Sequence, residues 1–208
     1  QRETDAYFSL LKEAASALDS GRLGPARSLL EATLSMKMSQ SGLVLLADTY
    51  LMEGKHDKAY TLLAPFVHTF AGRDILLLAS LAAAKRGEVY EGQADYCIKS
   101  ILLYHSSREE SVLKILPKAR DARTLEFLSS LALAVKFGST LNGAGFHHYM
   151  SLALEIKPTD VLANFHAADM FIQKKDYLSA KRSLHLVQER GNGFMSGFVK
   201  RKLDRLPK

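Results

Sequence analysis

The chain of 208 residues contains a single cysteine, no tryptophan and no apolar run of the ~18–20 residues that a membrane-spanning helix requires. One cysteine cannot form an internal disulfide, and Cys97 within ADYCIKSILLY is expected to be a buried small apolar residue. The longest apolar segment, Ile75–Ala84, fits a buried helix. The lack of disulfides fits a cytoplasmic protein and equally an all-helical bacterial periplasmic domain whose signal has been removed. The start at Gln1 rather than methionine suggests a processed or trimmed piece.

Strong charge of one sign is also lacking. The chain has 28 Lys and Arg against 22 Asp and Glu, a net charge of +6, which permits acidic partners without requiring them. The tail Val199–Lys208 is its most basic stretch and could contact phosphates or an anionic membrane surface. Basic side chains are also favoured near a helix C-terminus, so a solvated helix cap is the preferred interpretation and nucleic-acid binding is disfavoured.

A helical hairpin at residues 41–70 is the clearest pattern that is present. Apolar residues spaced three and four apart predict a first helix, Gly54 predicts the turn, and a second apolar face follows. Gly21, Gly54 and Gly87 recur at intervals of 33 residues, which indicates that the hairpin repeats. The apolar positions of the hairpin are Leu43, Leu46, Ala47, Tyr50, Ala59, Leu63 and Phe66.

The repeat divides the chain into one all-α domain over residues 1–208. Hairpins are predicted at about 4–36, 40–70, 73–105, 124–157 and 160–190, with a capping helix at 194–206. The stretch 106–123 departs from the pattern; a short helix over Arg108–Ala119 is expected there, ended or kinked by Pro117. Gly138–Gly145 (GSTLNGAG) is expected to be a flexible turn.

The order of large, small and aromatic positions resembles the tetratricopeptide repeat. The match is close in the second hairpin, and Ala153–Pro158 (ALEIKP) looks like the usual ending of such a repeat. The resemblance covers about 1–105 and 124–190 and implies a right-handed superhelical solenoid of hairpins. It further implies a concave groove lined by the first helix of each hairpin, which in this family binds peptides or helices of other proteins.

Two interpretations of the groove positions stay open. Because the set is unusually apolar for an exposed face, it predicts a groove for an apolar or amphipathic segment, with Met52 adaptable and Asp48, Asp169 and Lys85 adding polarity. Alternatively, tight curvature or the terminal helix buries these positions. By the spacing, they are Leu11, Leu18, Val44, Asp48, Leu51, Met52, Leu77, Leu81, Lys85, Leu131, Val135, Phe165, Asp169 and Ile172.

Signatures of catalysis or of metal binding are not found in the sequence. The seven histidines form no HExxH-like arrangement, and the adjacent His147 and His148 point about 100° apart on a helix, which makes them poor joint ligands. The segment GSTLNGAG lacks the Lys-Ser/Thr of a phosphate-binding loop, and no GxSxG elbow occurs. We therefore expect no catalytic residue, metal or cofactor.

A non-enzymatic scaffold or adaptor that binds another protein is the leading functional hypothesis. Two alternatives remain: an assembly factor of a bacterial envelope, pilus or secretion machine (a pilotin-like protein), and an RNA-binding helical-repeat protein. Exposed end faces of a repeat stack also allow a homodimer.

Overall fold

The computed structural model describes residues 2–67, 72–89, 91–139 and 143–207, and within these ranges it contains twelve α-helices and no β-strand. The predicted all-α class is therefore confirmed. The helices are α1 (Arg2–Asp19), α2 (Leu23–Met36), α3 (Gln40–Met52), α4 (His56–Leu63), α5 (Arg73–Lys85), α6 (Gln93–Leu103), α7 (Glu109–Ile115), α8 (Ala122–Ser139), α9 (Gly143–Ile156), α10 (Val161–Gln173), α11 (Tyr177–Arg190) and α12 (Ser196–Arg205), with 3-10 turns at Ala64–Phe66 and Ser106–Arg108.

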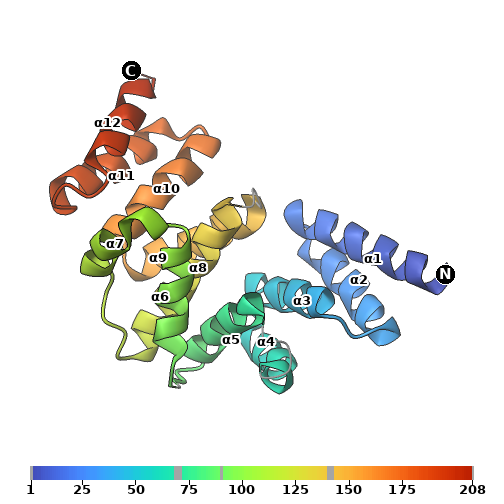
Figure 1. Cartoon of the computed structure of the whole chain (residues 1–208). Coiled ribbons are helices and arrows are strands. Elements are labelled where there is room, and N and C mark those ends of the chain that lie inside the picture. Colours follow the sequence, from blue (N-terminus) through green and yellow to red (C-terminus); the bar gives the residue numbers. More distant parts are fainter. Residues whose placement is uncertain (1, 68–71, 90, 140–142, 208) are drawn as a thin grey trace.

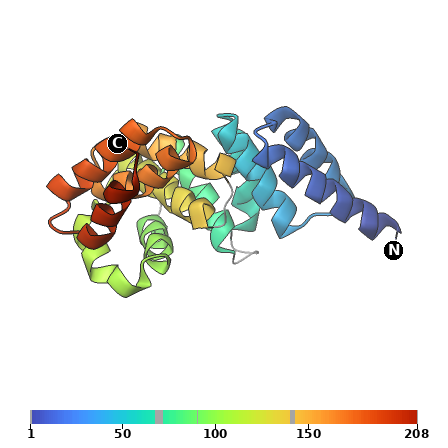
Figure 2. The ribbon, with the colours of Figure 1, turned by 90° about the horizontal axis from the view of Figure 1, so that it is seen from above.

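Pairs of consecutive helices are the building unit of the fold. Helices α1 and α2, α3 and α4, α8 and α9, and α10 and α11 pack against each other, and Figure 1 shows these pairs following a curved path from the N-terminal to the C-terminal end. Seen from above in Figure 2, α1 and α2 lie at one end of the molecule and α10–α12 at the other. One hydrophobic core runs through the array, and a small cluster of Ala17, Leu18 and Ala26 lies within the first pair.

The glycines spaced 33 residues apart end the first helix of each of the first three hairpins. Gly21, Gly54 and Gly87 have φ values of +72°, +74° and +78°, a left-handed conformation that glycine adopts without the clash of a Cβ atom. The backbone then folds back: Arg22 N–H donates to the carbonyl of Ala17, and Lys55 N–H to that of Tyr50. The predicted turns are thus confirmed at all three glycines.

The middle of the chain is irregular, as the sequence predicts, but α7 is shorter than the expected helix over 108–119. Leu116 already has an extended backbone (φ −71°, ψ 137°). Its conformation follows from Pro117, because the proline ring disfavours helical geometry in the residue before it.

The predicted flexible turn at 138–145 is only partly a turn. Gly138 and Ser139 belong to α8, and Gly143–Gly145 begin α9, so the connection is much shorter than expected. Residues 140–142 lie outside the described residues, as do residues 68–71 at the end of the second predicted hairpin.

Candidate functional site

Most of the predicted groove positions lie in the core rather than on an exposed face. Leu51 is 4% exposed and Leu81 is fully buried, so the expectation of a continuous open groove is wrong at these positions. The eight buried members of the set are Leu18, Asp48, Leu51, Leu77, Leu81, Leu131, Val135 and Phe165. The partly exposed members are Leu11, Val44, Met52, Lys85, Asp169 and Ile172.

Tight curvature explains this burial. Helix α8 packs against α5 and α6, and α9 reaches back to contact α1, so the fourth hairpin covers the faces of the first helices that an open superhelix would expose. The Tyr149 hydroxyl of α9 donates a hydrogen bond to Asp48 of α3 across this junction. Lys85 is likewise bound across it, with its ammonium 2.9 Å from a carboxylate oxygen of Glu126 on α8.

Asp48 is a buried carboxyl group at the centre of the junction. Burial raises its pKa to about 7, although the hydrogen bond from Tyr149 and the charge of Lys136 act in the opposite direction. Burial also raises the pKa of Tyr149 well above its usual value, so this residue stays a hydrogen-bond donor. Lys136 in turn forms an ion pair with Asp74 of α5. These polar contacts join the N-terminal hairpins to the α8–α9 pair.

A cavity of about 450 Å³ remains open between the first helices of the fourth and fifth hairpins. Three of the predicted groove residues, Val135, Asp169 and Ile172, line this cavity. We call it the α8–α10 cavity; its other lining residues are Tyr104, Gly138, Ser139, Phe146, His166 and Gln173. Of the binding surface that was predicted along the whole array, the α8–α10 cavity is therefore the part that remains a candidate.

Polar side chains surround the apolar part of the cavity. Asp169 pairs with Lys202 of α12 at 2.5 Å and keeps 45% of its side chain exposed, and Lys202 lies 5.0 Å from the centre of the Phe165 ring. The side-chain oxygen of Gln173 lies 3.1 Å from Nε2 of His147 on α9. The cavity therefore offers an apolar interior with carboxylate and amide oxygens as acceptors at its edge.

Two histidines meet beside the cavity. The Nε2 atoms of His105 and His166 are 2.9 Å apart, with one ring edge facing the other ring. Because one nitrogen must donate and the other accept, the contact requires the accepting ring to be neutral and is lost when both rings are protonated. Burial, with the charges of His105 and Lys202, lowers the pKa of His166 to about 3; burial, followed by the charge of Arg108, lowers that of His105.

Because of this histidine pair, we expect the stability of the folded chain to fall in acid. Because the pKa of His166 is lower in the folded chain than its usual value of 6.5, its contribution to stability is complete above pH 6.5 and is lost as the pH falls. The unfolding free energy of the unaltered chain should fall between pH 7 and pH 5. We expect this fall to be about 2 kcal/mol smaller in the His166→Gln variant. Urea unfolding at both pH values measures the unfolding free energies, and His185→Gln, at an exposed position, is the control. An equal fall in unfolding free energy in the two variants would contradict the prediction.

A metal centre would need one group of three or more potential ligands, and the described part of the chain offers no such group. The two histidine nitrogens alone provide fewer ligands than a zinc site uses.

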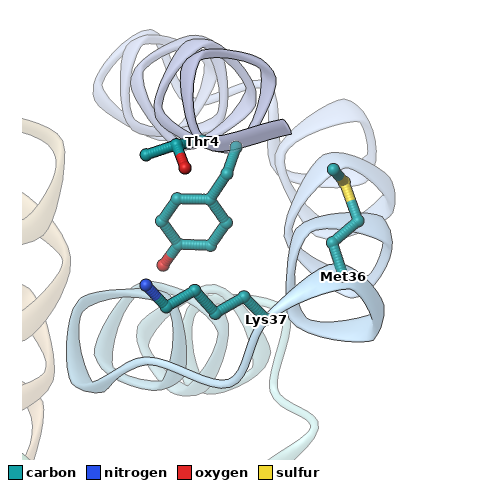
Figure 3. A pocket seen from close by; sticks show the side chains of 4 residues that line it. Thr4, Met36 and Lys37 are labelled. Atoms are coloured by element: carbon teal, nitrogen blue, oxygen red, sulfur yellow. The ribbon is translucent and has the colours of Figure 1, made fainter. Parts of the chain in front are cut away.

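Other cavities lie away from the predicted groove. Thr4, Tyr7, Met36 and Lys37 line one of about 350 Å³ at the N-terminal end, and Figure 3 shows Thr4 and Lys37 on opposite sides of it. The Lys37 ammonium is 5.7 Å from the centre of the Tyr7 ring, whose hydroxyl donates to Ser39. The ordinary packing between α1, α2 and the start of α3 accounts for these contacts.

Several residues at the α8–α10 cavity were not predicted from the sequence. Tyr104 and His105 directly follow α6, and His166 on α10, which contacts His105, lies 61 positions after it in the chain. None of the seven histidines belongs to an HExxH-like arrangement, so the sequence did not identify any of them as a site residue. No local pattern could have paired His105 with His166, because only the path of the chain brings them together.

Comparisons of the chain with protein-family models, with curated proteins and with solved structures give no match. Among the described residues, no helix combines the length and the apolar character needed to cross a membrane.

Proposed function

We propose that the chain is a non-enzymatic adaptor, built as a solenoid similar to tetratricopeptide repeats, that holds a peptide or amphipathic helix of another protein. The single observation that carries the proposal is the α8–α10 cavity, where a partly apolar opening of about 450 Å³ coincides with three predicted groove residues. Turn glycines at 33-residue intervals and the pairing of consecutive helices support the repeat architecture.

The chemistry of the cavity suits one large apolar side chain of a bound segment. Val135, Phe146 and Ile172 supply the apolar lining. Transfer of an apolar side chain from water into such a site favours binding by about 25 cal/mol per Å² of apolar surface buried. At the edge, the carboxylate of Asp169 and the side-chain oxygen of Gln173 could accept hydrogen bonds from N–H groups of the partner.

The test uses a displayed library of random short peptides, selected on the intact chain. We expect enriched peptides to share one large apolar residue, and we expect Ile172→Asp to weaken their binding by roughly tenfold or more, because a carboxylate at the cavity wall must lose its hydration when the apolar side chain enters. Fluorescence anisotropy of a labelled selected peptide gives the affinity.

Leu178→Asp is the matched control, since Leu178 is 61% exposed on α11 and the substitution likewise replaces a branched apolar side chain by aspartate, away from the cavity. It should alter peptide affinity by less than about twofold. Equal loss of binding in the two variants, or equal retention, would reject the cavity as the binding site.

A further inference from the structure

The whole net charge of the chain belongs to its last 48 residues. Residues 161–208 contain ten Lys and Arg against four Asp and Glu, whereas residues 1–160 contain eighteen of each and are neutral. In Figure 1 this basic part, α10–α12, forms one end of the array. Such separation of charge creates a positive potential over one end of the molecule and attracts anionic partners to it.

Few of these cationic side chains are neutralised within the described residues. Lys202 forms an ion pair with Asp169, and Lys181 Nζ donates to the carbonyl of Pro207. The remaining Lys and Arg of α11 and α12 make no ion pair with any part of the chain that the structure describes. Arg201 and Arg205 are exposed on α12.

An arginine cluster is organised around an exposed aromatic ring on α12. Phe198 is 41% exposed, and its ring centre lies 4.5 Å from the guanidinium carbon of Arg201 and 4.8 Å from that of Arg108. Arg205 follows Arg201 at the i+4 position and therefore lies on the same side of the helix. We call Arg108, Phe198, Arg201 and Arg205 the arginine face. Stacking on the ring holds the guanidinium groups in place, so less side-chain entropy is lost when they bind a carboxylate through two parallel hydrogen bonds.

We propose that the arginine face binds an acidic segment of a partner protein. Carboxylates fit the two-pronged geometry of guanidinium donors and complement the charge of this end of the chain. The proposal concerns a surface on α12 and the Ser106–Arg108 turn, so it does not depend on peptide binding in the α8–α10 cavity.

Two other anionic partners fit the arginine face less well. A membrane would need an apolar face to insert, but Val199 is fully buried and Leu203 and Leu206 pack against the core. Single-stranded RNA binds through successive bases stacked on aromatic rings, whereas Phe198 is the one exposed large aromatic among the described residues of α10–α12, and guanidinium groups already lie on its ring.

The first test measures binding of a fluorescein-labelled polyglutamate peptide to the full chain at low ionic strength. We expect Arg201→Glu/Arg205→Glu to weaken binding by roughly tenfold, because two attractive charges become repulsive. The matched control is Lys99→Glu/Arg120→Glu, which makes the same change in net charge at exposed positions of the neutral part and should weaken binding much less. Circular dichroism checks that both variants are folded.

A second variant separates the arginine geometry from charge alone. Arg201→Lys/Arg205→Lys keeps both charges but removes the planar donors, and we expect it to weaken binding by about threefold. Equal affinity of the lysine variant and the unaltered chain would overturn the proposed site in favour of diffuse attraction. Tighter binding of an oligouridylate of equal charge, or of phosphatidylserine vesicles, would overturn the choice of an acidic protein segment. Equal weakening by the two charge-reversal variants would overturn the location.

Discussion

Leu81→Asp is expected to unfold the chain. Leu81 is fully buried on α5 and belongs to the continuous core together with Leu77 and Leu131. A carboxylate at this position has no partner in an apolar surrounding, and its desolvation costs several kcal/mol, a large part of the roughly 5–15 kcal/mol that stabilises a typical domain. If the groove interpretation of these positions held, the variant would instead stay folded and lose only the binding of a partner.

Graded substitutions and circular dichroism make this expectation measurable. Leu81→Ala, which leaves a cavity without adding charge, should lower the unfolding free energy by roughly 2–5 kcal/mol and keep a cooperative transition. Leu178→Asp, at an exposed position of α11, should change it by less than about 0.5 kcal/mol. A Leu81→Asp chain with an unaltered thermal transition would show that the face of α5 is open to solvent.

Asp48→Asn should stabilise the chain at alkaline pH and much less at acidic pH. The pKa of Asp48 is raised in the folded chain from 3.8 to about 7, so its contribution to stability is complete below pH 3.8 and is lost as the pH rises toward 7 and above. This loss amounts to roughly 4 kcal/mol. Asparagine does not ionise and can still accept a hydrogen bond from Tyr149, so the variant avoids the loss.

The measurement is the difference in unfolding free energy between Asp48→Asn and the unaltered chain, taken by urea unfolding from pH 4 to pH 9. Comparing the two chains at each pH removes the opposite effect of His166, whose contribution falls as the pH falls. We expect the unfolding free energy of the variant, relative to that of the unaltered chain, to increase as the pH rises from 4 to 7. A difference that does not vary with pH would contradict a raised pKa at Asp48.

These two expectations concern the same structural junction. Leu81 and Asp48 lie on first helices of neighbouring hairpins, and α8 and α9 cover both. The apolar contacts supply most of the free energy of this junction, because burial of a leucine side chain is worth about 1.5–3 kcal/mol. The Asp48–Tyr149 hydrogen bond adds directional specificity, since a buried donor or acceptor without a partner would be costly.

Local structure could be predicted well from the sequence. Apolar spacing identified the helices, and Gly21, Gly54 and Gly87 identified the turns, because helix periodicity and a left-handed φ depend on a few neighbouring residues. Where the prediction was imprecise, as at α7 and around Gly138, the helix ends depended on the residue before Pro117 or on packing against the adjacent helix.

The candidate site could be predicted only in part. Val135, Asp169 and Ile172 were identified by their position on first helices and do line the α8–α10 cavity. Tyr104, Phe146 and His166 were not, since they reach it from the residue after α6, from α9 and from α10. The arginine face has the same origin: the sequence showed a basic tail, but Arg108 joins Phe198 and Arg201 only through folding.

The helical hairpins follow from local properties of the sequence, namely the period of its apolar residues and the places of its turn glycines. Which apolar faces stay open depends on how the hairpins pack together. A leucine on a first helix has the same pattern whether the array curves gently or tightly, and the free energy gained by burying it drives closure wherever another hairpin can reach. Here α9 contacts α1 and α3, so Leu51 and Leu81 belong to the core, whereas Val135, Asp169 and Ile172 line the α8–α10 cavity.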